Sequence, residues 1–203
     1  MISFKTKKWY RSYGLRIRDF IWMEISRLNM PWYPLCELDR SLRARDMCPV
    51  IPKVMKTGSG EIDLTVFNSP HVELLTRYER EGDRILELEN FRTSRYYQMH
   101  RGWREAGVNP EARTDEWILD RKAKGLVALY KSIRDKGYSY EAANGTFVAV
   151  LEEPLAWTKY GHQWEMDGFE LFDGGHRAAC LCALGYTKMK VLVLSWVKKR
   201  HSS

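Results

Sequence analysis

The sequence predicts an α/β fold, and its C-terminal third carries the strongest indications. Residues 169–172 alternate as a short strand, residues 177–184 have helical character and end at Gly185, and residues 189–197 are apolar enough for another strand. A glycine-rich turn separates the first strand from the helix. Strand, turn, helix and strand in this order, in 203 residues of which 44% are hydrophobic, predict a folded domain of helices packed on a sheet.

Residues 61–203 are predicted to form this domain. Residues 62–67 alternate as a strand, after which Ser69 and Pro70 provide the N-cap and the first position of a helix. Residues 83–120 are rich in arginine and aromatic residues and predict a helical insertion, with helices around 84–90 and 94–106. A longer helix is predicted over residues 121–136, ending at Gly137, and a strand over residues 146–151.

Residues 1–60 are predicted to form a basic N-terminal helix followed by an irregular arm. Between residues 15 and 28, arginines are interleaved with apolar residues at helical spacing, namely Leu15, Ile17, Phe20, Ile21, Ile25 and Leu28. Residues 1–20 contain six basic residues and one acidic residue, a net charge of +5. With such an amphipathic helix, the chain can bind an anionic membrane surface through residues 1–28, although packing of the helix on its own domain is the favoured alternative.

Composition narrows the classes of protein to which the chain can belong. The mean hydropathy is −0.48 and no apolar run approaches the length of a membrane span. The N-terminus does not have the pattern of a secretory signal, and the four cysteines have neither zinc-binding nor disulfide-framework spacing. We therefore expect reduced thiols and a cytoplasmic location, with peripheral contact at the inner membrane face as an addition. The net charge of +7 is compatible with nucleic acid, an anionic membrane or a phosphorylated ligand.

The most specific motif is the pentapeptide Asp173-Gly174-Gly175-His176-Arg177 between the predicted strand and helix. Its two glycines permit a sharp turn and a close approach of the backbone to a ligand. The free N–H groups of the first helical turn favour an anion, and His176 and Arg177 add donors at the same place. The pattern predicts a phosphate-binding loop; the alternative is a structural turn in which Asp173 caps the helix.

With its surroundings, this motif resembles the ParB/sulfiredoxin-like superfamily. The resemblance is carried by residues 129–137 (LYKSIRDKG), by the strand at 147–151 and by residues 168–194 (GFELFDGGHRAACLCALGYTKMKVLVL). It covers roughly residues 121–197, with the strand near 62–67 and the SPH sequence at 69–71 as weaker N-terminal candidates. It implies a domain with a mixed sheet and an α-helical insertion, in which residues 173–177 bind the phosphates of a nucleotide.

The branches of the superfamily imply different activities. Sulfiredoxins have a reactive cysteine where this chain has Gly175, and Cys180 is expected to face the packing side of its helix, so sulfiredoxin activity is not expected. Chromosome-partitioning ParB proteins continue into a helix-turn-helix domain, whereas this sequence stops at Ser203, so sequence-specific DNA binding is not expected either. The most similar branch has an Asp-Gly-His-His-Arg loop and includes free-serine kinases; only Gly175 departs from that loop.

This branch implies a kinase that phosphorylates a small hydroxylated metabolite, with ATP as the nucleotide and Mg²⁺ as the ion. The alternative is a ParB-like nucleotide- or DNA-binding module without kinase activity, and the sequence does not decide between ATP and CTP. The predicted nucleotide-binding residues are His71, Gly174, Gly175, His176 and Arg177, and the predicted Mg²⁺ ligand is Asp173. The predicted catalytic residues are Asp173, His176, Glu73 and Glu152, with Glu153 and Asp63 as further candidates for the base.

The other histidines are not predicted to build a site. His100 and His162 have no partner at a metal-ligand spacing, and His201 belongs to a basic tail. A metal site built from histidines is therefore not predicted.

Overall fold

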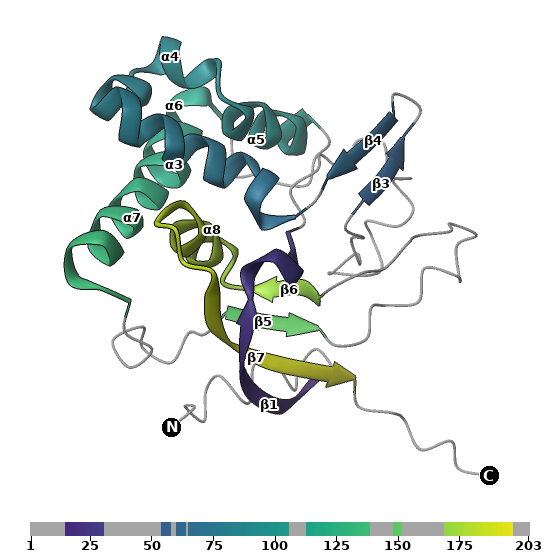
Figure 1. Ribbon diagram of the computed structural model, residues 1–203. Helices are drawn as coiled ribbons and strands as arrows, with labels where there is room; N and C mark the ends of the chain where they lie inside the picture. Colours follow the sequence, from purple (N-terminus) through teal and green to yellow (C-terminus); the bar gives the residue numbers. More distant parts are fainter. Residues whose placement is uncertain are drawn as a thin grey trace.

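The computed structural model describes residues 15–30, 54–57, 60–63, 65–105, 113–138, 148–151 and 169–196, and it is a mixed α/β structure (Figure 1). Its strands are β1 (Leu15–Glu24), β2 (Leu28–Asn29), β3 (Val54–Thr57), β4 (Gly60–Asp63), β5 (Val148–Leu151), β6 (Phe169–Asp173) and β7 (Lys188–Trp196). Its α-helices are α3 (Pro70–Glu81), α4 (Leu88–Arg92), α5 (Arg95–Glu105), α6 (Asp115–Trp117), α7 (Lys124–Lys136) and α8 (Gly175–Ala183). A π-helical segment, Ile118–Ala123, joins α6 to α7.

The main sheet is mixed, as predicted, and has the strand order β1-β7-β5-β6-β2. Strand β7 pairs antiparallel with β1 and parallel with β5, while β6 pairs antiparallel with β5 and parallel with β2. Strands β3 and β4 form a separate antiparallel hairpin. The first and last described strands of the chain therefore lie side by side, so residues 15–24 belong to the same sheet as the C-terminal third.

The helices cover one face of this sheet, and α8 lies between the sheet and the other helices (Figure 1). Alternation along β7 gives each face its own apolar side chains, since Val191 and Val193 join the helix-side core whereas Leu192 and Leu194 join a smaller cluster on the opposite face. Helix α8 contacts α3, α7 and β5, and Ala178, Ala179 and Cys180 are completely buried within it. Small side chains allow α8 to pack closely against both layers.

The prediction of an amphipathic helix over residues 15–28 is wrong, because these residues form β1, a 3₁₀ turn (Ile25–Arg27) and β2. A β-bulge explains the misleading spacing: the register of β1 with β7 shifts between Ile17 and Asp19. Before the bulge Ile17 faces the smaller cluster; after it Phe20 does, while Ile21 faces the helix-side core. Because of the extra residue, Phe20 and Ile21 follow Ile17 by three and four positions instead of two, and this spacing of apolar residues resembles that of a helix. The membrane-binding prediction thereby loses the helix on which it depended.

Most of the other predicted elements are confirmed. The Ser69 hydroxyl accepts a hydrogen bond from the Val72 N–H at 3.3 Å, and Pro70 opens α3. Helix α7 ends before Gly137, whose φ of 75° suits a residue without a Cβ. The strand predicted over residues 62–67 is confirmed only as far as Asp63, since residues 66–68 form a 3₁₀ turn.

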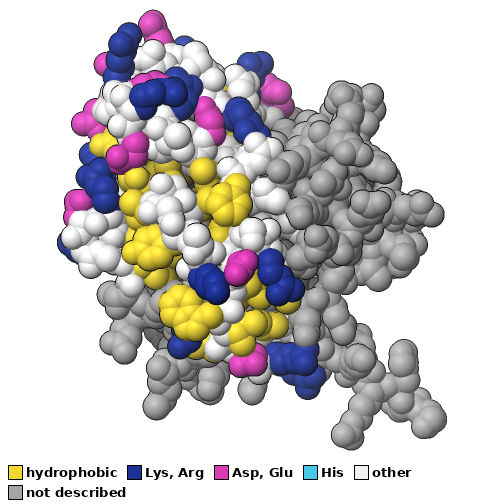
Figure 2. All heavy atoms as spheres, viewed as in Figure 1, with side chains coloured by type: hydrophobic (Ala, Val, Ile, Leu, Met, Phe, Trp, Pro, Cys, Tyr) yellow, Lys and Arg dark blue, Asp and Glu magenta, His cyan; other side chains and the backbone are white. Residues whose placement is uncertain are grey.

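Charged side chains form ion pairs on the surface of the helical insertion. On the face drawn in Figure 2, basic and acidic side chains are interspersed over the helical part of the molecule, and no patch of one sign dominates it. Asp115, for example, accepts from Arg92 and from Arg104 at 2.9 and 3.0 Å. Among the described residues, no helix has the length and apolar character needed to cross a bilayer.

The placement of β1 in the sheet predicts unequal effects of two substitutions in that strand. Leu15 is fully buried, so Leu15→Ala should lower the free energy of unfolding by about 2–5 kcal/mol. Trp22 is 63% exposed, so Trp22→Ala should cost about 1 kcal/mol or less. Urea unfolding of both variants tests this, and equally small effects would mean that residues 15–24 are not part of the sheet.

Candidate functional site

The loop between β6 and α8 has the conformation that its glycines require. Gly174 is the N-cap of α8, with φ 79° and ψ 20°, in the left-handed region that side chains disfavour. Its N–H donates to Asp173 Oδ1 at 2.7 Å. A Cβ on Gly175 would lie 2.8 Å from the Met30 methyl carbon, so the second glycine lets Met30 approach the first turn of α8.

A cavity of about 460 Å³ opens at this loop. Alternation along β6 places Leu171 and Asp173 on the helix side of the sheet. The other walls come from distant parts of the chain: Met30 after β2, His71 of α3, His100 and Trp103 of α5, Lys122 of the π-helical segment and Leu129 of α7. Residues that are far apart in sequence thus surround the N-terminus of α8, and the volume is that of a small-molecule site.

Three histidines lie in the walls of this cavity. His71 is 5.2 Å from His176 between ring centroids, and it also contacts Tyr96 in an edge-on arrangement at 4.8 Å. Tyr96 in turn contacts His100 at 4.7 Å, and His100 contacts Trp103 at 5.1 Å. An aromatic row therefore extends from the α8 loop into the insertion.

All three imidazoles are held in the neutral form. Burial lowers the pKa of His71 far below its ordinary value, and the neighbouring His176 and His100 lower it further. Burial together with the charge of Lys122 lowers the pKa of His100 to about 3. The pKa of His176 is lowered by burial and then by Lys122 and Arg177. At neutral pH each ring therefore has one N–H donor and one bare nitrogen acceptor.

Several of these groups lack hydrogen-bond partners among the described residues. The atoms concerned are His71 Nδ1, both ring nitrogens of His100 and the Tyr96 hydroxyl. Buried polar groups are normally paired, and each unpaired one costs about 1–3 kcal/mol. Of these three residues, His71 and His100 also line the cavity.

The cavity also combines two cations with one carboxylate. Lys122 and Arg177 line it beside the first turn of α8, which together provide positive charge and N–H donors for an anion. Burial raises the pKa of the Asp173 carboxyl, while the Gly174 N–H and the Arg177 charge partly oppose this effect. The described residues contain no group of three or more His, Cys, Asp or Glu side chains that could hold a metal ion.

The structure brings together all the predicted residues of the loop. Asp173, Gly174, Gly175, His176 and Arg177 line the cavity, and His71 joins them from the first turn of α3. Cys180 is fully buried as a free thiol on the packing side of α8, as predicted, and burial raises its pKa to about 12. Glu152 and Glu153 lie outside the described residues, as do His162 and His201, and the Asp63 side chain is not described.

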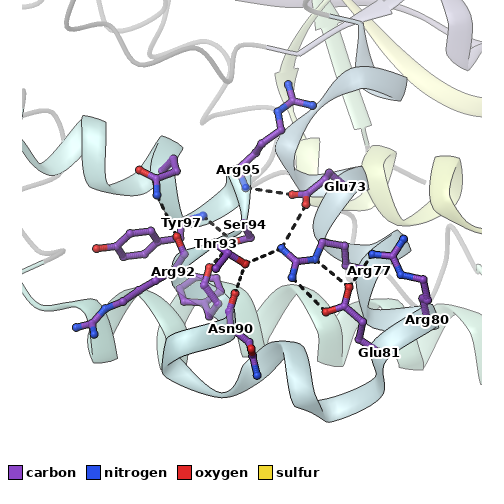
Figure 3. Close-up of polar contacts among 12 residues, drawn as sticks. Glu73, Arg77, Arg80, Glu81, Asn90, Arg92, Thr93, Ser94, Arg95 and Tyr97 are labelled. Carbon is purple, nitrogen blue, oxygen red and sulfur yellow. Dashed lines mark hydrogen bonds and ion pairs between the residues drawn. The ribbon is translucent and has the colours of Figure 1, made fainter.

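Glu73 is not among the residues that line the cavity, and Figure 3 shows its contacts with Arg95 and Arg77 instead. Two residues after His71, it lies about 200° further around α3, on the opposite side of that helix. It accepts a hydrogen bond from the Arg95 N–H at the start of α5, at 3.2 Å, and lies 3.7 Å from Arg77. Arg77 also holds Glu81 through two contacts of 3.1 Å. Glu73 thus joins α3 to α5, and the structure does not support its prediction as the base.

Sequence reasoning missed His100, Trp103 and Lys122 as site residues. Tyr96, His100 and Trp103 have the i, i+4, i+7 spacing of one helix face, a signal that was present in the sequence. Lys122 had no such signal. It reaches the cavity from a π-helical segment, an irregularity that often accompanies functional sites and that spacing alone does not predict.

The neutral state of His100 predicts a specific dependence of stability on pH. Its folded pKa of about 3 lies below the ordinary 6.5, so the unfolded chain binds the proton more readily and stability falls as the pH drops below 6.5. Between pH 7 and pH 5 the wild type should lose about 2 kcal/mol more than His100→Phe, which cannot take up this proton. Urea unfolding at both pH values measures the difference, and parallel losses would contradict a buried neutral His100.

Comparison of the chain with protein-family models, with curated proteins and with solved structures finds no match. The resemblance of the α8 loop and its flanking elements to ParB/sulfiredoxin-like proteins therefore stays a prediction.

Proposed function

We propose that this chain is a nucleotide-dependent phosphotransferase with a ParB/sulfiredoxin-like fold, which transfers a phosphoryl group from ATP to a small hydroxylated metabolite. The observation that carries the proposal is the convergence of a left-handed glycine turn, a helix N-terminus, two cations and a half-buried carboxylate on one cavity. Phosphoryl transfer depends mainly on positioning and charge stabilisation, which these groups can provide.

The phosphates would bind at the first turn of α8. The residues of this turn line the cavity, and the first N–H groups of a helix have no acceptor within the helix. Arg177 can hold phosphate oxygens in a bidentate manner. Lys122 lines the same cavity from the π-helical segment and supplies a second positive charge. This distribution of donors suits a chain of phosphates better than a single small anion.

Asp173 is the residue that would hold Mg²⁺. Magnesium usually keeps several waters and binds one or two carboxylates together with substrate phosphates, so a single carboxylate beside the phosphate site is sufficient. When bound, the ion would neutralise charge on the transferred phosphoryl group. Ionisation of Asp173 is opposed by its burial, and a nearby cation would favour the charged form.

The order of elements supports the proposed fold family. Helix α7, strand β5, strand β6, the glycine loop, helix α8 and strand β7 follow one another as the resemblance implies. His176 stands where the loop of the kinase branch has its second histidine. Its ring is neutral and close to His71, so either imidazole can accept a hydrogen bond from the attacking hydroxyl.

A second candidate is a nucleotide-binding module without turnover. It is favoured by the content of the cavity wall, in which Asp173 is the only carboxylate among the described residues. Such a module would bind nucleotide through the same loop and form no phosphorylated product.

Arg177→Ala should weaken ATP binding about ten- to hundredfold, because it removes a charge-assisted bond to phosphate. Isothermal titration with Mg²⁺ and ATP measures the change. Arg80→Ala is the control: its side chain is 70% exposed on α3 and pairs with Glu81, so the variant matches the charge change and should bind as the wild type does. Equal affinities of all three proteins would refute the phosphate site.

Asp173→Asn should reduce phosphoryl transfer at least a hundredfold without lowering the melting temperature. The amide oxygen can still accept from Gly174, and the fold disfavours the charged form that the substitution removes. Turnover is measured by profiling a metabolite mixture for products labelled from γ-phosphate-labelled ATP.

Two results would change these assignments. Full turnover by the asparagine variant would make Asp173 structural and direct attention to Glu152 and Glu153. The absence of any product from the wild type, with nucleotide binding intact, would favour the module without turnover.

A further inference from the structure

The part of the cavity wall that α3 and the helical insertion form presents hydrogen-bonding groups that phosphates cannot satisfy. His100 is only 3% exposed and lines the cavity, yet neither of its ring nitrogens has a hydrogen-bond partner among the described residues. His71 is 4% exposed, and its Nδ1 is likewise without a partner in the described part of the chain. Two buried histidines in the wall of one cavity thus have hydrogen-bonding atoms without partners among the described residues.

The chemistry of His100 restricts what can occupy this space. Its ring is neutral, so one nitrogen donates a hydrogen bond and the other can only accept one. An ionised phosphate or carboxylate has no proton to donate, and it can therefore satisfy only the first nitrogen. A ligand that satisfies both must present a donor as well as an acceptor, as hydroxyl groups and the edges of nucleobases do.

The shape of the same wall favours a flat ligand group. Trp103 lines the cavity next to His100, and the two rings meet edge to face, 5.1 Å apart at an interplanar angle of 82°. Met30 and Leu129 add apolar surface to the lining. Nucleobases stack on aromatic side chains of this kind with little dependence on which base is present.

We propose that His71, His100 and Trp103 form a nucleoside subsite, in which the base lies against Trp103 and the base and ribose supply the hydrogen bonds that the histidines lack. The inference rests on the proposed function, since it assumes that the phosphates of the same nucleotide bind at the α8 loop. It assigns the two ends of the ligand to different parts of the chain: the triphosphate to residues 173–177, and the nucleoside to His71 of α3 together with His100 and Trp103 of the helical insertion.

Two variants separate nucleoside contacts from phosphate contacts. His100→Phe removes both nitrogens but keeps an aromatic ring between Tyr96 and Trp103, and Trp103→Leu removes the stacking surface. Affinities for ATP, CTP and inorganic tripolyphosphate are measured by titration calorimetry with Mg²⁺. We expect each variant to bind the tighter of the two nucleotides at least tenfold more weakly, with unchanged affinity for tripolyphosphate. Arg177→Ala should weaken the nucleotide and tripolyphosphate alike.

Stability distinguishes a ligand contact from a structural one. Because an apolar ring replaces unpaired buried nitrogens, His100→Phe should melt at the same temperature as the wild type or higher at pH 7, even though it binds nucleotide less well. Trp22→Leu is the matched control for Trp103→Leu, because Trp22 is an exposed residue of β1, and it should leave all affinities unchanged.

The outcomes also separate this inference from the proposed function. If the wild type binds tripolyphosphate as tightly as either nucleotide, or if both cavity variants bind nucleotide normally, the subsite is overturned while the phosphate site stands. A parallel loss of nucleotide and tripolyphosphate binding in His100→Phe would also overturn it. If the wild type binds none of the three ligands, the proposed function fails together with the subsite.

Discussion

The packing of α8 between the sheet and the helical layer is the constraint on which the rest of the structure depends. Its buried side chains are small, so the helix contacts β5 on one side and α3 and α7 on the other. Its N-terminus consequently opens where β6 ends and where α3, α5 and the π-helical segment converge. The left-handed Gly174 is what allows β6 to turn into α8 at this point, because a Cβ there would strain the backbone. The cavity is a product of this arrangement and not of any one motif.

Several groups in the cavity wall lower the stability of the fold. Nitrogens of His71 and His100 that have no partner among the described residues oppose folding, as does the burial of the Asp173 carboxyl. The core around them is apolar and fully buried, with Leu74, Leu75 and Leu126 among its members. Groups that weaken a fold but face a shared cavity are characteristic of binding and catalytic sites. This pattern supports a ligand at the site independently of the family resemblance.

Prediction from sequence succeeded where the signals were local. The Ser69-Pro70 start of α3 and the glycines after α7 and α8 act over a few residues, and the structure has these boundaries. It failed in β1, where a bulge at Ile17 and Asp19 changed the apolar spacing into one that resembles a helix. A bulge is specified by the partner strand, and for β1 that partner is β7, about 170 residues later in the chain.

The sequence by itself determined that residues 173–177 form a glycine turn at a helix N-terminus, because glycine conformation and helix capping are short-range effects. It also determined that Cys180 would be a buried thiol, through its position on the packing face of that helix. Only the tertiary structure decided that Glu73 faces away from the loop while His71, His100, Trp103 and Lys122 face it. Which face of a helix meets a distant loop depends on long-range packing between layers, and no spacing within the helix encodes what lies across from it.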